Sequence, residues 1–138
     1  MQDDERRMKI VMKNNSQVPI GNYKLRTIDP ADIQKFDGSP IPPEAVLLHE
    51  VVEQWQLYTT RPQMTYTQAK KVALQAEEMY TGLKRISDPP GSIAHSTPGI
   101  STTYVWRYQY PDPDGRKITM QVHVTNGNVT SVNWWPDE

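Results

Sequence analysis

Apolar and polar side chains alternate along three stretches near the C-terminal end of this 138-residue chain. The stretches cover residues 103–110, 117–125 and 129–135, and short segments rich in Pro, Asp, Asn and Gly separate them. Successive side chains of a strand point to opposite faces of a sheet, so this alternation predicts strands with one buried face. We therefore expect a three-strand antiparallel meander whose apolar side needs a covering layer.

The apolar face also predicts how these strands pair. We expect Tyr108 opposite Ile118 in the first hairpin and Val122 opposite Val132 in the second, because both hairpins then bury the same face. A slip of one residue would turn that set towards water. Most aromatic residues of the meander should therefore belong to the core. Trp135 faces the other way, so the sheet surface around it is a candidate site for a protein partner.

Two helix-periodic segments predict the covering layer. The first starts at Pro43 and should end before Pro62, because the residue that precedes a proline disfavours helix. The second opens with a capping box at Thr65 and Gln68, and Gly82 is suited to cap its end. On the first helix we expect an apolar stripe to be buried: Leu48, Val51, Val52, Trp55 and Tyr58.

The whole chain, residues 1–138, is predicted to be a single α+β domain. In chain order its parts are N-terminal strands and turns (1–41), two packed central helices (42–85) and the C-terminal meander (92–138). Two short strands at residues 9–12 and 18–28 should join or cap the sheet, and residues 92–102 resemble a loop.

Composition excludes several classes of function. The net charge is −1, with 15 basic and 16 acidic residues. The chain therefore has no excess of basic residues that would indicate binding to nucleic acid. We expect neither a signal peptide nor a transmembrane segment, because no apolar run is long enough. The chain has no cysteine, so a bound metal would need His, Asp, Glu or water. The lack of cysteine fits the cytoplasm, or delivery as part of a larger secreted protein.

One motif in the first predicted helix points to chemistry. The residues His49-Glu50-Val51-Val52-Glu53 place His49 and Glu53 one helical turn apart on the same face. Zinc hydrolases use two such ligands with a neighbouring carboxylate that activates water. We therefore assign His49 and Glu53 as candidate metal ligands and Glu50 as candidate general base. Glu77, at the edge of the second helix, is the candidate third ligand. The remaining imidazoles are His95 and His123.

The helical pair resembles the zincin-like metallopeptidase domains of bacterial secreted and polymorphic-toxin proteins. The resemblance covers residues 44–85 and rests on the HExxE motif and on Tyr66–Glu77, which is similar to a Tyr-x-x-Ala-His-x-x-Ala-x-x-Ala-Glu helix. It implies a zinc-dependent hydrolase of the peptidase type, with a peptide or protein substrate and a toxin or effector role. Lys70 departs from the pattern: it stands at the position of a ligand-type histidine, and its ammonium would repel a dication.

A second interpretation remains open. A histidine and a glutamate four residues apart also form an ordinary intrahelical pair. The HExxE helix would then be structural, and the chain would be a non-catalytic interaction, accessory or inhibitory module. In that case the surface near Trp135 would bind a partner. The metal content of the purified protein and of His49→Ala distinguishes the two interpretations.

Overall fold

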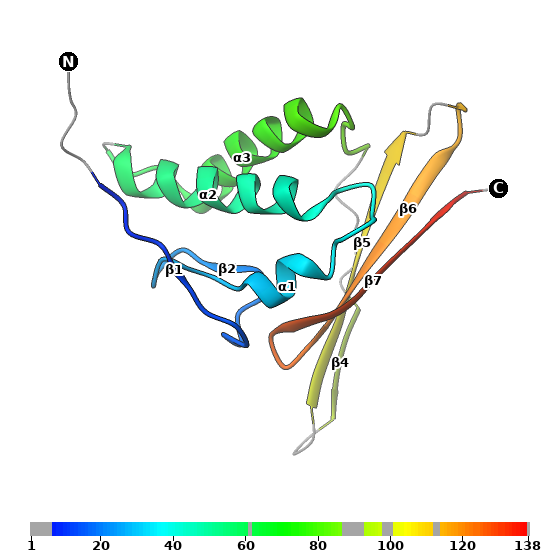
Figure 1. Ribbon diagram of the computed structural model, residues 1–138, viewed down its shortest axis with the longest axis horizontal. Helices are drawn as coiled ribbons and strands as arrows, with labels where there is room; N and C mark the ends of the chain where they lie inside the picture. The colour runs from blue at the N-terminus through cyan, green and yellow to red at the C-terminus, as the bar shows by residue number, and fades with distance from the viewer. Residues whose placement is uncertain (1–6, 61, 87–92, 98–100, 112–113, 138) are drawn as a thin grey trace.

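Three helices and two β-sheets make up the part of the chain that the computed structural model describes, which is residues 7–60, 62–86, 93–97, 101–111 and 114–137. In chain order the elements are β1 (Val11–Met12), β2 (Gly21–Asn22), β3 (Thr27–Ile28), α1 (Pro30–Gln34), α2 (Pro43–Thr59), α3 (Tyr66–Thr81), β4 (Ile93–Thr97), β5 (Ser101–Pro111), β6 (Lys117–Thr125) and β7 (Asn128–Pro136). Figure 1 shows α2 and α3 as a pair beside the long strands β5, β6 and β7. The predicted α+β class is confirmed.

The two long helices begin and end close to the predicted residues. At the start of α3, Thr65 and Gln68 exchange hydrogen bonds between their side chains and backbone N–H groups, which is the expected capping box. Gly82 ends this helix with a left-handed φ of 74°, a conformation that favours glycine. Among the described helices, none combines the length and the apolar character that crossing a membrane requires.

The buried face of α2 is not the predicted apolar stripe. Trp55 is 37% exposed, and the other members of the stripe are only partly buried. The buried residues of α2 are Ala45, Val46, Glu53, Gln54 and Leu57. The stripe prediction was wrong because polar side chains can be buried where neighbouring elements supply partners for them. Gln54, for example, donates a hydrogen bond of 3.1 Å to the carbonyl of Thr27 on β3.

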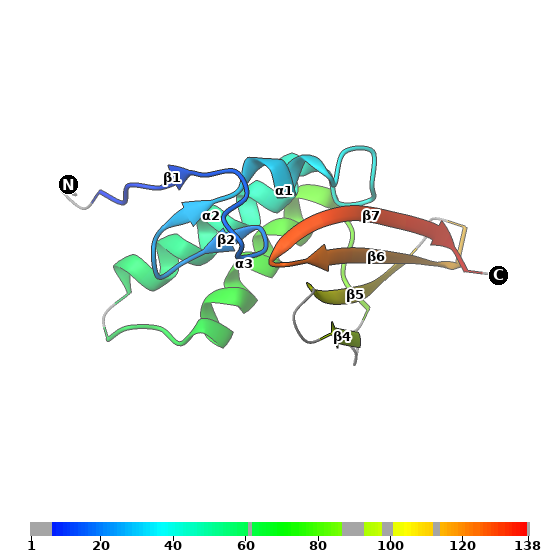
Figure 2. The same ribbon diagram turned by 90° about the horizontal axis from the view of Figure 1, so that it is seen from below.

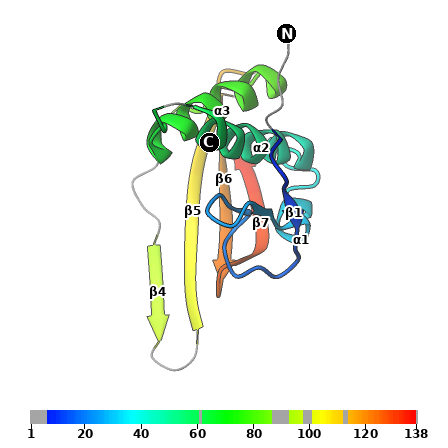
Figure 3. The ribbon, with the colours of Figure 1, turned by 90° about the vertical axis from the view of Figure 1, so that its left-hand side faces the viewer.

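Strands β4 to β7 form one antiparallel sheet in chain order. The sheet has four strands and not three, because β4 lies within residues 92–102, which we expected to be a loop. Figure 3 shows β4 at the end of the sheet that is farthest from α2 and α3. The strands that face the helices are therefore β5, β6 and β7.

Strand register is right in one predicted hairpin and wrong in the other. Val122 pairs with Val132 as expected, and a bulge lies between His123 and Val124. Tyr108 pairs with Met120, two residues away from its predicted partner Ile118. A shift of two residues leaves every side chain on its predicted face, so the apolar face does not distinguish the two registers.

The N-terminal strands form a separate small sheet in the order β1-β3-β2 and do not join the larger one (Figure 2). The predicted strand at residues 18–28 is in fact two strands, β2 and β3, connected by a tight turn. Asp32 on α1 connects this region to the larger sheet. Its carboxylate accepts hydrogen bonds from the backbone N–H groups of Ile20, at 2.9 Å, and Val129, at 2.8 Å.

The core lies where α1, α2 and the small sheet meet the apolar face of β5, β6 and β7. Its buried members are Ile28, Ile33, Phe36, Ile41, Ala45, Val46, Tyr110, Met120, Val122, Val124, Val129 and Val132. Trp134 pairs with Met120 but is 42% exposed, so it does not belong to the core as we expected of most aromatic residues in the meander. It lies on β7, one of the two edge strands of the sheet.

Candidate metal centre

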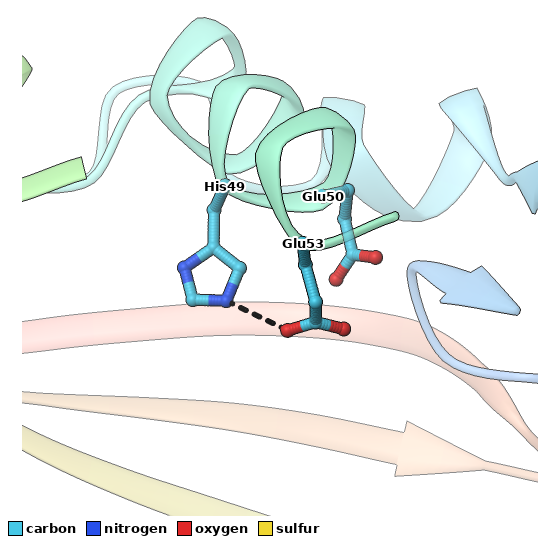
Figure 4. Close-up of side chains that lie close together, drawn as sticks. All are labelled: His49, Glu50 and Glu53. Carbon is cyan, nitrogen blue, oxygen red and sulfur yellow. Dashed lines mark ion pairs between the residues drawn. The ribbon is translucent and has the colours of Figure 1, made fainter. Parts of the chain in front are cut away.

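Three donor groups converge on one turn of α2. A ring nitrogen of His49 and carboxylate oxygens of Glu50 and Glu53 lie within 4.8 Å of one another. Figure 4 shows the three side chains on the same side of α2. Glu53 is buried, whereas His49 and Glu50 are partly buried. The helical spacing read from the sequence produces this arrangement, because residues three and four apart share a face.

The closest pair in this cluster is spaced as two ligands of one zinc ion would be. Nε2 of His49 lies 3.3 Å from Oε2 of Glu53. The two atoms are also within hydrogen-bond distance, so the same contact is an ion pair when His49 is protonated. Two ligands of a tetrahedral zinc ion, each about 2.0–2.2 Å from the metal, are separated by roughly 3.4 Å. The donor types and their spacing therefore fit a divalent cation.

The other nitrogen of the same imidazole faces α3. Nδ1 of His49 lies 3.2 Å from Oε1 of Glu77, which is buried. The sequence predicted Glu77 as a third ligand, and the structure brings it to the opposite side of the ring from Glu53. A carboxylate at this place holds the imidazole in one orientation and one tautomer, with Nδ1 protonated and Nε2 available to a metal.

Buried carboxylates dominate the electrostatics of the site. Burial raises the pKa of Glu50 to about 7, and the charge of Glu53 adds to the shift. Within the described parts of the chain, no hydrogen bond or ion pair engages the Glu50 carboxylate. Arg85 lies 3.8 Å from Glu77 and stacks over the ring of Tyr108 at 4.4 Å, so it partly balances the charge of Glu77.

The protonation of His49 depends on the same carboxylates. Burial on its own would lower the pKa of His49, but the hydrogen bonds to Glu53 and Glu77 outweigh it and raise the pKa to about 9. Without a metal, His49 is therefore an imidazolium between two carboxylates at neutral pH. A cation that binds Nε2 must displace that proton.

The cluster lines a pocket of about 430 Å³ between α2, α3, β5 and the chain before β2. One wall carries His49, Glu50 and Glu53. The lining also includes apolar and aromatic side chains, namely Phe36, Ile41, Val46, Trp106, Tyr108 and Met120, and the basic side chains of Lys70, Arg85 and Arg107. A pocket that combines convergent polar groups with apolar side chains is a usual form of a small-molecule or substrate site.

Two further residues of the pocket were not predicted from the sequence as functional. Tyr66 is 43% exposed, yet desolvation and the nearby charges of Glu53 and Glu50 raise the pKa of its hydroxyl, which also hydrogen-bonds to Glu53. Its ring stacks on Tyr23, with centroids 5.2 Å apart. Lys70 lines the same pocket one turn later on α3. The Tyr-x-x-Ala-Lys spacing was the available signal.

Of the other histidines, His123 lies away from the described cluster. His123 lies on β6 opposite Ser131, and it is not among the residues that line the pocket. His95 lies on β4, and its side chain is outside the described residues.

Comparison of the chain with models of protein families, with curated proteins and with solved structures gave no match.

Proposed function

We propose that this protein is a zincin-like, metal-dependent hydrolase of the peptidase type. The observation that supports it best is the convergence of His49, Glu50 and Glu53 in the wall of a pocket, with donor atoms within 4.8 Å. In this proposal His49 and Glu53 hold the ion. Glu77 is a positioning residue that accepts the Nδ1 proton of His49, which is the usual outer partner of a metal-bound imidazole.

The bound cation, with zinc as the first candidate, would polarise a carbonyl oxygen and acidify water. The chain itself supplies the proton transfers. Glu50 accepts the proton of the attacking water and passes it to the leaving group. Its pKa of about 7 suits a group that must both accept and release a proton near neutral pH. Tyr66, beside Glu53, is placed to orient that carboxylate.

The substrate class follows from the resemblance to zincin-like domains together with the shape of the pocket. A peptide or protein segment is the proposed substrate, with an apolar side chain against Trp106, Tyr108 and Met120. A toxin or effector role belongs to the same proposal and rests on the resemblance.

The test begins with metal content. Purified protein should hold one equivalent of zinc by elemental analysis, and His49→Ala and Glu53→Ala should lose it. His123→Ala is the matched control, because it removes an imidazole from β6 outside the pocket and should keep the metal. Hydrolysis of an unfolded protein should then stop on addition of a chelator and return with zinc. A folded, metal-free protein that is indifferent to zinc and chelator would refute the proposal.

One observation favours a second candidate, a non-catalytic interaction module. Trp134 is 42% and Trp135 is 41% exposed, and both lie on the edge strand β7. Exposed tryptophan is common at protein interfaces. In this candidate His49, Glu53 and Glu77 form a structural ion-pair network, and the sheet surface near Trp135 binds a protein. Stability that is unchanged by zinc and by chelators would favour this function over the hydrolase.

A further inference from the structure

A tight turn of the N-terminal segment forms part of the pocket wall opposite Glu50. Pro19, Ile20 and Gly21 all line the pocket. The N–H of Gly21 donates a 2.7 Å hydrogen bond to the carbonyl of Pro19, and Ile20 between them has a φ of +65°. This is a γ-turn with a positive φ at its centre, a rare and strained conformation. A β-branched residue is especially unfavourable in that region of φ.

Helix α1 holds this strained turn in place from both sides. The N–H of Ile20 donates to a carboxylate oxygen of Asp32 at 2.9 Å. The carbonyl of Ile20 accepts a 2.8 Å hydrogen bond from the N–H of Asp29. Both aspartates are buried. Strained backbone persists where surrounding contacts fix it, and it gathers at functional sites.

Gly21 follows the turn and lies directly against the Glu50 side chain. A β-carbon at position 21 would overlap Oε2 of Glu50 and would lie 2.9 Å from its Cδ. It would also lie 3.3 Å from Nε2 of Gln54, one turn further along α2. The backbone of β2 at Gly21 therefore packs against two side chains of the helix, and a β-carbon at position 21 would require the carboxylate end of Glu50 to move.

We infer that Gly21, held by the Ile20 turn, is a positioning residue that sets where the Glu50 carboxylate lies in the pocket. This inference rests on the proposed function, in which Glu50 is the general base. The geometry explains why a carboxylate without a hydrogen-bond partner among the described residues still has a defined place. The backbone at Gly21 blocks one side of it, and the neighbouring Gln54 is itself fixed by its hydrogen bond to Thr27.

The first experiment measures catalysis in Gly21→Ala. Its zinc content should stay at one equivalent, because the atoms nearest to a β-carbon at position 21 belong to Glu50 and Gln54, not to His49 or Glu53. Its kcat should fall between about tenfold and a hundredfold, the effect of moving a catalytic group by about 1 Å, while KM changes little. Lys24→Ala is the matched control, because it alters an exposed side chain of the same segment and should leave kcat unchanged.

Rescue gives the sharper result. Glu50→Asp shortens the carboxylate by one methylene group and makes room for the new β-carbon. Gly21→Ala should therefore cost far less kcat in the Glu50→Asp background than in the unsubstituted protein. An equal loss in both backgrounds, or full kcat in Gly21→Ala alone, would overturn the inference and leave the proposed function intact.

A stability measurement separates this inference from the proposed function. Gly21→Ala is made in two backgrounds, the unsubstituted protein and the Glu50→Ala variant, and unfolded with urea. The substitution should lower the unfolding midpoint in the first background and leave the midpoint nearly unchanged in the second. An equal decrease of the midpoint in both backgrounds would show that Gly21 does not pack against Glu50, whether or not the protein is an enzyme. If the unsubstituted protein shows no metal-dependent hydrolysis, the proposed function fails, and the catalytic part of this inference fails with it.

Discussion

His49 and Glu77 join the two long helices through one short contact, with Nδ1 of the imidazole 3.2 Å from a carboxylate oxygen. The histidine comes from α2 and the glutamate from α3, so the packing of the two helices sets the orientation of the ring. Nε2 is left facing Glu53 on the other side. The candidate centre therefore depends on a residue that lies outside the HExxE motif.

Replacing Glu77 with glutamine should weaken zinc binding by about tenfold to a hundredfold, the usual effect of losing an outer carboxylate. The amide can still accept from Nδ1 but no longer stabilises positive charge on the ring. Competition with a chromophoric chelator measures the affinity, and Glu78→Gln provides a control at the next position of the same helix. Unchanged affinity in Glu77→Gln would mean that Glu77 does not orient the metal-bound ring.

Glu50→Gln should separate the role of a base from that of a ligand. The amide keeps the size of the side chain but cannot accept a proton, so kcat should fall at least about a hundredfold while zinc content stays at one equivalent. Elemental analysis and a chelator-sensitive hydrolysis assay measure the two quantities on one preparation. Loss of the metal in this variant would assign Glu50 as a ligand instead.

The metal-free protein should lose stability as the pH rises. The pKa of His49 is raised from 6.5 to about 9, so its contribution to the free energy of unfolding is fully present below pH 6.5 and disappears as the pH approaches 9. The size of this contribution is on the order of 3 kcal/mol. Urea unfolding in the presence of a chelator measures it, and His49→Gln should flatten the curve over that window.

Glu50 should cause a second loss of stability with rising pH, in a lower pH range than that of His49. Its pKa is raised from 4.5 to about 7, so the protonated carboxyl favours the fold below pH 4.5 and that advantage is lost as the pH rises to 7. Glu50→Gln should remove this lower slope and keep the upper one. A stability curve that rises with pH in the metal-free protein would contradict both assignments.

Asp32→Ala should destabilise the fold by about 2–4 kcal/mol, because two backbone N–H groups, those of Ile20 and Val129, lose their acceptor. Asp32→Asn should destabilise the fold less than Asp32→Ala does, because an amide still has one oxygen that can accept one of these two hydrogen bonds. The control is Asp37→Ala, an exposed aspartate just after α1, for which a change within about 0.5 kcal/mol is expected. Chemical denaturation of the three variants provides the comparison.

Local signals predicted the helices well, and long-range partners explain what was missed. The ends of α3 follow from Thr65, Gln68 and Gly82, whose effects act within one turn. The buried face of α2 depends on Glu53 and Gln54 having partners on α3 and β3, which lie far away in the sequence. The periodicity therefore identifies an apolar stripe, but the α2 sequence alone does not show which face of the helix is buried.

The sheet shows the same division. Alternation in β5 fixes which face Tyr108 occupies, and that prediction holds. Whether Tyr108 pairs with Ile118 or Met120 depends on the connection between β5 and β6, and both choices keep the same residues inside. For the site, the sequence indicated His49, Glu50 and Glu53 on one turn. It could not indicate that Glu77 would meet Nδ1.

The close approach of Glu50, Glu53 and Glu77 to a single histidine affects how stable and how abundant the protein would be in a cell. The carboxylates of Glu50 and Glu53 repel each other, and the ion pair that Arg85 makes in this cluster is with Glu77. A doubly charged ion would relieve that repulsion and bind only the folded chain, which shifts the folding equilibrium in proportion to its concentration. Under the proposed function, cells starved of the ion would unfold and degrade more of this protein, so its abundance would report on metal supply.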